Sequence, residues 1–188
     1  MTAIEPMTTD PLATPSRSPE MFRRPLDVIL DEHYRQRLVC DRLDQLAAQL
    51  EIEAVADRAA TILSFLTEDL ALHTEDEERD LFPFLRQRCL PEDGIDEVLI
   101  QLSDEHDLDK DLVDFIVADM QTIASGHRLA NPIRLFMNVS AFTATQRRHL
   151  GWENRVVLPL ARKRLTDDDL GELGSRMAAR RGIVSPAI

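Results

Sequence analysis

Two stretches of the chain place a histidine, a glutamate four residues later and a proline six residues after that with the same spacing. They read HTEDEERDLFPFL at 73–85 and HLGWENRVVLPLA at 149–161. On an α-helix, residues i and i+4 lie on one face one turn apart, so His73 would meet Glu77 and His149 would meet Glu153. An imidazole and a carboxylate placed in this way can bind one metal ion, or they can form a simple hydrogen-bonded pair. One such pair is a weak signal, whereas its repetition makes a metal site the hypothesis to test.

Two further histidines, His33 and His106, each end a DEH triplet. The four histidines fall one on each of four segments with helical periodicity, on the face that is otherwise apolar. A single histidine in such a place is usually a core residue bonded to a carbonyl group. Four imidazoles and two carboxylates in one core are costly to bury without a compensating charge, which bound cations supply. Six ligands exceed a tetrahedral zinc site and divide into two metals, each with two histidines, joined by two bridging glutamates.

The helices that must position these residues are predicted from apolar residues at three- and four-residue steps. Long helices are expected at 25–50, 53–88, 94–125 and 131–164, and a shorter one at 167–181. Long amphipathic helices with short connections pack as a bundle. We therefore predict an all-α protein. An antiparallel up-down four-helix bundle spans 25–165, with a mobile, disordered N-terminal tail at 1–24 and a short extra C-terminal helix and tail at 166–188.

Two prolines, Pro83 and Pro159, lie inside the second and fourth helical patterns. Proline lacks an N–H group and its ring crowds the preceding turn, so each is expected to kink or end its helix locally. The apolar side chains beside them would then plug that end of the bundle. These are Phe82, Phe84, Leu158 and Leu160.

The order of these motifs resembles the hemerythrin family, specifically its HHE cation-binding branch, over about residues 26 to 165. The matching motifs are ILDEH, HTEDEERDLFP, SDEHD and HLGWENRVVLP. The resemblance implies a four-helix bundle with an oxo- or hydroxo-bridged centre of two iron ions, zinc or manganese being the alternatives. It also implies bridging roles for Glu77 and Glu153. The terminal imidazoles would come from His33, His73, His106 and His149.

One position departs from the family pattern. Oxygen-carrying hemerythrins have a second histidine four residues after the one in the third helix, where this chain has Lys110. Lysine is a poor iron ligand at neutral pH, and Asp109 or a nearby carboxylate is the alternative for that position. We therefore expect binding or sensing of oxygen, nitric oxide, peroxide or iron rather than reversible oxygen carriage. A di-iron oxidase or peroxidase and a purely structural metal stay open as alternatives, although no general base or cofactor motif indicates an enzyme.

Several further polar residues lie near the motifs in the sequence. Asp69 is either a hydrogen-bond acceptor for a ligand imidazole or a surface residue. Glu32 and Glu105 precede histidines in the chain and are expected to face elsewhere, and Glu78 is expected to be solvated. His127 lies in a predicted turn, where no role is expected.

Composition limits the partners. The net charge of −12 over 188 residues argues against nucleic acid, which a protein of this charge would repel. The two cysteines form no CxxC pair, and the sequence shows neither a signal-peptide pattern nor a long apolar span. We therefore expect a cytoplasmic protein with reduced thiols and no membrane partner. A protein partner or a homo-oligomer stays open.

Overall fold

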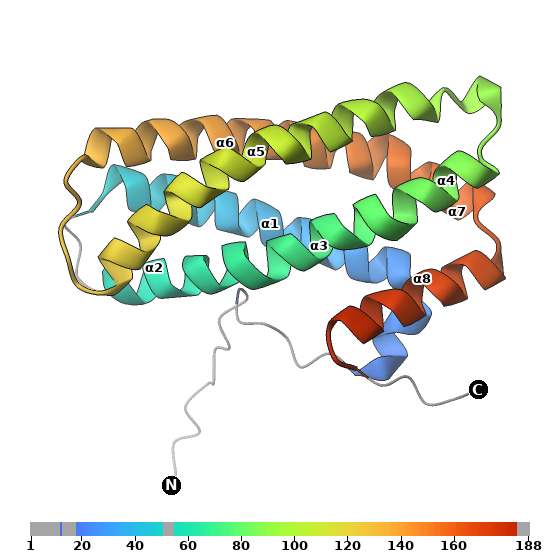
Figure 1. Ribbon diagram of the computed structural model, residues 1–188, viewed down its shortest axis with the longest axis horizontal. Coiled ribbons are helices and arrows are strands. Elements are labelled where there is room, and N and C mark those ends of the chain that lie inside the picture. The colour runs from blue at the N-terminus through green and yellow to red at the C-terminus, as the bar shows by residue number, and fades with distance from the viewer. Residues whose placement is uncertain (1–11, 13–17, 51–54, 184–188) are drawn as a thin grey trace, which may run out of the picture.

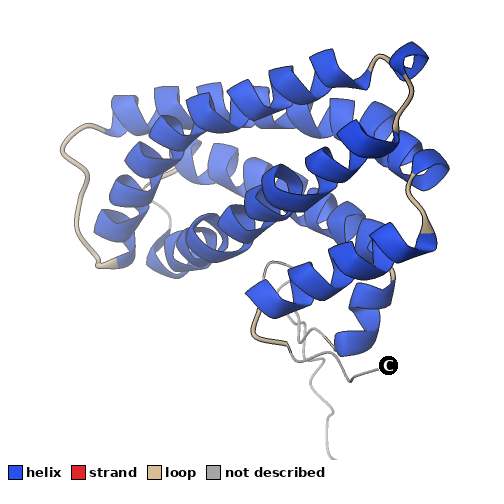
Figure 2. Ribbon diagram, turned by 45° about the vertical axis from the view of Figure 1, so that its right-hand side comes forward, coloured by secondary structure: helices blue, strands red, loops and turns tan. Residues whose placement is uncertain are grey.

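The computed structural model describes residue 12 and residues 18–50 and 55–183, and all regular structure within these residues is helical (Figures 1 and 2). The predicted all-α bundle is confirmed. Figure 1 shows the chain running back and forth along the long axis of the molecule, with a direction change at each connection. Within the described residues, no helix is sufficiently long and apolar to cross a membrane.

In the part of the chain that the structure describes, four helical rods and one short helix form the bundle. The first rod is α1, Pro25–Ala48. The second consists of α2 (Val55–Ser64), a π turn (Phe65–Asp69), α3 (Leu70–Asp76), a second π turn (Glu77–Leu81) and α4 (Phe82–Arg88). The third is α5, Ile95–Ala124, and the fourth consists of α6 (Pro132–Trp152), a π turn (Glu153–Val157) and α7 (Leu158–Arg164). Helix α8 spans Asp167–Arg180, and short 3₁₀ turns span Pro19–Arg23 and Pro91–Asp93.

The π turns account for the repeated proline of the two motifs. Neither rod ends at its proline, because the helix widens one turn before it. The N–H of Phe82 donates to the carbonyl of Glu77, and the N–H of Leu158 donates to that of Glu153, each five residues apart. A widened turn accommodates a residue that lacks an N–H and crowds the preceding carbonyl. Each of these two π turns begins at the glutamate of its motif, so the helix widens at the residue whose carboxylate enters the centre.

The hydrophobic core is divided into two clusters, and the polar motifs lie between them. One cluster gathers apolar residues from the start of α1 and α5 and from α4, α7 and α8. The other gathers residues from the end of α1 and α5 and from α2 and α6. On every rod the histidine stands between the residues of the two clusters. The predicted end plug belongs to the first cluster, with Phe82, Phe84 and Leu158 buried and Leu160 partly buried.

The N-terminal segment meets α8. Most of the predicted tail, residues 1–11 and 13–17, lies outside the described residues, but Pro19–Arg23 forms a 3₁₀ turn against α8 with Phe22 buried. Gly174 of α8 allows this close approach, since a Cβ there would lie 1.9 Å from the carbonyl oxygen of Phe22. Thr166 is the N-cap of α8: its hydroxyl oxygen accepts from the N–H of Asp169, and its own N–H donates to the Asp169 carboxylate in a capping box.

Candidate metal centre

The structure brings all six predicted residues together between the two hydrophobic clusters. They form two groups, each able to hold one metal ion, with the ligand atoms of a group within 4.8 Å of one another. One group is His33, His73, Glu77 and Glu153, and the other is Glu77, His106, His149 and Glu153. Both glutamates belong to both groups, which is the arrangement that two adjacent cations with two bridging carboxylates require.

The carboxylate oxygens lie against the Nε2 atoms of the histidines. Oε1 of Glu153 is 2.8 Å from Nε2 of His149, and Oε2 of Glu153 is 3.3 Å from Nε2 of His33. Oε2 of Glu77 lies between the other two imidazoles, 3.4 Å from Nε2 of His73 and 3.5 Å from that of His106. Each glutamate thus reaches one histidine of each group.

Two imidazoles are held by carboxylates of a neighbouring helix. Nδ1 of His73 lies 3.2 Å from Oε2 of Glu32 on α1, and Nδ1 of His149 lies 3.1 Å from Oε2 of Glu105 on α5. A carboxylate only accepts hydrogen bonds, so Nδ1 donates in both pairs. The expectation that Glu32 and Glu105 face elsewhere is therefore wrong, because both are buried against an imidazole.

The remaining two imidazoles are held by the residue that follows each motif glutamate. Nδ1 of His106 lies 2.7 Å from Oε1 of Glu78, and Nδ1 of His33 lies 2.9 Å from Oδ1 of Asn154. Glu78 is therefore only partly solvated, contrary to the sequence-based expectation. A neutral imidazole whose Nδ1 donates a hydrogen bond has its lone pair on Nε2, the atom that a metal needs, so these contacts orient all four rings for metal binding.

Several buried polar atoms of the centre lack a hydrogen-bond partner within the described part of the protein. Nε2 of His33, His73 and His149 and all four oxygens of Glu77 and Glu153 are buried without a hydrogen bond of proper geometry. Lone pairs of the imidazoles and the carboxylates therefore face one another. Buried polar atoms are normally paired, so such a cluster indicates a missing positive charge. The donor set of imidazole nitrogen and carboxylate oxygen fits a pair of transition-metal cations.

The pKa shift of Glu77 also indicates that the cluster lacks a positive charge. Burial raises the pKa of Glu77 well above its ordinary value, and the charge of Glu153 raises it further. Burial also acts to raise the pKa of Glu153, but His149 and His33 outweigh it and hold that pKa below its ordinary value. Burial lowers the pKa of His33 to about 4, which keeps this imidazole neutral and able to bind a metal. The two carboxylates cannot both ionise cheaply unless cations replace the proton.

Comparison with known proteins places this geometry in a family. The family model for the hemerythrin HHE cation-binding domain matches residues 24–161, which is well over half of the chain. The chain belongs to the hemerythrin family. The resemblance seen in the sequence is thereby confirmed, and with it a domain that binds metal cations. No curated protein matches the chain.

Four other polar residues considered in the sequence lie outside both metal groups of the hemerythrin domain. Asp69 is buried and makes an ion pair with Arg35 at 2.8 Å, so it is not a surface residue. Lys110 is exposed, and Asp109 is buried but belongs to neither metal group. Burial raises the pKa of Asp109 to about 6. His127 is exposed and also belongs to neither group.

The contacts of the hemerythrin domain that sequence reasoning missed follow its internal repeat. The first half comprises α1 to α4 and the second α5 to α7, and each contains one DEH triplet and one histidine–glutamate–proline motif. In each half, the glutamate of the DEH triplet contacts the imidazole of the histidine–glutamate–proline motif. The residue after the motif glutamate holds the DEH histidine of the other half. The first rule joins Glu32 to His73 and Glu105 to His149; the second joins Glu78 to His106 and Asn154 to His33. The repeated DEH triplet was the signal that could have identified Glu32 and Glu105.

Proposed function

We propose that the chain is a di-iron protein whose centre binds or senses oxygen, nitric oxide or peroxide, or holds iron itself, without reversible oxygen carriage. The observation that supports this proposal is the sharing of Glu77 and Glu153 by two four-ligand groups. Two separate structural zinc sites would each need a closed set of four ligands of their own. Neutral imidazoles with bridging carboxylates suit iron.

An open position for a small ligand follows from the ligand count. Each group offers two imidazole nitrogens and two shared carboxylates, and the residue at the family's additional histidine position, Lys110, is exposed. No further histidine, cysteine or carboxylate of the described residues joins either group. When iron is bound it supplies redox chemistry and ligand binding. The protein holds the imidazoles through Nδ1 and keeps the two carboxylates buried between the two hydrophobic clusters.

The proposed location is the cytoplasm, and the proposed partners are small ligands. Cys40 and Cys89 are both free, which supports reduced thiols. An oxidase or peroxidase uses the same open position and is the second candidate, supported by the cavity beside the centre that His73 and His106 line.

Elemental analysis of protein expressed without added metal tests the proposal. Two irons per chain, with a visible absorption band that appears in air and shifts on addition of azide, is the expected result. One zinc per chain without colour would overturn it and would support a structural metal. A peroxide-consumption assay then separates the two candidates, because a sensor binds its ligand stoichiometrically and an enzyme turns peroxide over repeatedly.

A further inference from the structure

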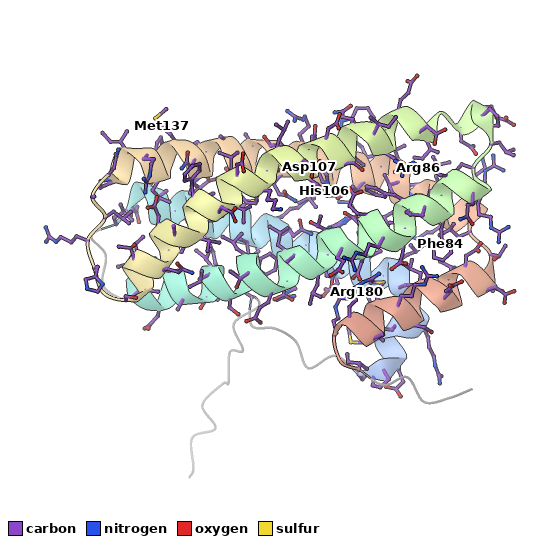
Figure 3. The ribbon with its side chains drawn as sticks, viewed as in Figure 1. Phe84, Arg86, His106, Asp107, Met137 and Arg180 are labelled. Atoms are coloured by element: carbon purple, nitrogen blue, oxygen red, sulfur yellow. The ribbon has the colours of Figure 1, made fainter. Side chains whose placement is uncertain are left out.

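A cavity of about 610 Å³ lies beside the metal centre, between α5 and the part of the second rod that runs from Leu66 to Glu78. Helix α5 packs against α2 and α4, and Figure 1 shows it crossing the second rod at the α2 end and lying apart from α3. His73 and His106, one from each metal group, form part of the cavity wall. Figure 3 shows His106 on the side of α5 that faces the second rod.

The volume of the cavity is larger than a diatomic gas needs, and its lining suits an organic molecule. A water molecule takes up about 30 Å³ of liquid, and sites for organic ligands commonly measure roughly 300–1,000 Å³. The walls are largely aliphatic and aromatic: Leu66, Leu70, Val113, Val117 and Phe142. The charged groups of the lining are mostly acidic, with Glu78, Asp107, Asp109 and Asp114 against Lys110 alone. An acidic lining disfavours anions.

We infer that this cavity binds a neutral organic molecule with an apolar body and an oxygen-donor head directed at the metal centre. The inference rests on the proposed function, because the head requires a coordination position at the iron. The apolar walls supply affinity for the body in proportion to its buried area. Gln146, buried in the lining and donating to Gln36 at 2.6 Å, gives the inner part of the cavity a fixed polar group.

A homologous series of hydroxamic acids tests the inference on the iron-loaded protein. These acids are neutral in solution at neutral pH, bind iron through the two oxygens of one common head with release of the N–OH proton to solvent, and differ in tail length. We expect the affinity, measured by calorimetry, to rise about fourfold per added methylene from acetohydroxamic to hexanohydroxamic acid. Val113→Trp should abolish this gain and leave acetohydroxamic acid bound as in the wild type. Phe115→Trp, on the same helix but with an exposed side chain outside the cavity, is the matched control.

Three outcomes are distinguishable. If acetohydroxamic acid does not bind, the open iron position is absent and the proposed function fails. If all members bind equally to the wild type, the centre is open but the cavity inference is overturned, whatever the variants do. If Val113→Trp weakens the shortest and longest members alike, the tail does not occupy the cavity and the inference fails.

A second observation lies on another face of the centre, at α8, beyond the residues that the family model matches. Arg181, directly after α8, places Nη2 3.0 Å from Oε1 of Glu32 and 2.7 Å from Oδ2 of Asp76. The other oxygen of Glu32 accepts from Nδ1 of His73. Arg181, Glu32 and Asp76 are all buried to 5% exposure or less at the side chain.

The geometry points to Arg181 as a positioning residue that couples the docking of α8 to metal binding at His73; this too rests on the proposed function. A buried carboxylate that lost its guanidinium would move or take up a proton, and its hold on the imidazole would weaken. Coupling of this kind is reciprocal, so metal binding must stabilise the docked α8 by the same factor.

Matched arginine variants test the coupling. Arg181→Met should weaken metal binding about tenfold, whereas Arg180→Met should leave it within about twofold. Arg180 pairs with Asp76 and Asp80 from the same helix end, whereas Arg181 pairs with Glu32; Figure 3 shows Arg180 between α8 and the second rod. Metal should also slow amide exchange across α8 in the wild type and in Arg180→Met, but not in Arg181→Met. Equal metal affinity in both variants, or equal protection of α8 in all three proteins, would overturn the inference.

Discussion

Glu105 on α5 holds His149 on α6 through a contact of 3.1 Å between Oε2 and Nδ1, and Glu32 on α1 holds His73 on α3 in the same way. The two contacts are equivalent under the internal repeat of the chain. Each fixes the rotation of an imidazole and the position of its proton from a separate helix. The orientation of the metal-facing nitrogen therefore depends on helix packing as well as on the histidine itself.

Glu105→Ala should weaken metal binding although Glu105 belongs to neither ligand group. Loss of a carboxylate that orients a ligand imidazole typically costs about 10–100-fold in metal affinity. Competition with a chelator of known affinity measures the change. Glu97→Ala, an exposed glutamate of the same helix, is the control and should bind metal as the wild type does. Unchanged affinity in Glu105→Ala would show that the contact has no orienting role.

His149→Ala should lower metal content and melting temperature together. A metal at about 100 times its dissociation constant stabilises the folded state by ~2.7 kcal/mol, and this contribution is lost with the site. The gap between variant and wild type should shrink when both are measured with chelator. His127→Ala, which changes an exposed histidine, should alter neither quantity. Retention of both metals by His149→Ala would refute its assignment as a ligand.

The metal-free protein should lose stability as pH rises. The pKa of Glu77 is raised in the folded state, by burial first and by Glu153 second, above an ordinary value of 4.5. Its stabilising contribution is therefore complete below that value and is lost as pH rises toward the folded pKa. The slope from this group reaches at most about 1.4 kcal/mol per pH unit. Urea unfolding with chelator from pH 5 to 8 measures it.

Glu77→Gln isolates this titration, because glutamine has no proton to lose over the range. The variant should show a flatter dependence of unfolding free energy on pH than the wild type. Identical slopes in the two proteins would mean that Glu77 titrates normally, and the description of the cluster as short of positive charge would lose its support.

Gly174→Ala should destabilise the protein, whereas Gly171→Ala on the same helix should not. A Cβ at Gly174 would meet the carbonyl oxygen of Phe22 at 1.9 Å, so the 3₁₀ turn must move away. Exposing the Phe22 side chain costs roughly 1.5–3 kcal/mol. A Cβ at Gly171 meets nothing within 4 Å, and alanine there should stabilise the helix by roughly 0.5–1 kcal/mol. Urea unfolding of both variants compares them, and equal stabilities would place Phe22 off α8 in solution.

Helical periodicity predicted the rods and the six polar residues between the two hydrophobic clusters because both depend on local spacing. His73 and Glu77, four residues apart, share a face on any helix, and repetition in the other half indicated a shared site. The π turns were not predicted: Pro83 was expected to kink or end its rod, whereas the helix widens before it and continues.

The contacts to Nδ1 could not be read from the same periodicity. Glu32 is adjacent to His33 in the chain and points about 100° away from it on α1, which suggested a surface position. It instead faces α3, because a bundle helix contacts two neighbours and therefore buries more than one stripe. The pairing of Glu32 with Arg181, 149 residues away in sequence, depends on where α8 docks, which no local pattern specifies.

The division of the core into two hydrophobic clusters has a consequence for emptying and refilling the centre. Each end of the bundle is held by its own apolar contacts, so departure of the ions would remove support from the middle layer and from the α8 contact at Arg181, and would leave both hydrophobic clusters in place. The imidazoles remain oriented by their Nδ1 partners, and an incoming cation finds its donors already in place. Release and uptake can therefore proceed as reversible exchange within an intact fold, in contrast to small zinc domains, which unravel when stripped of metal.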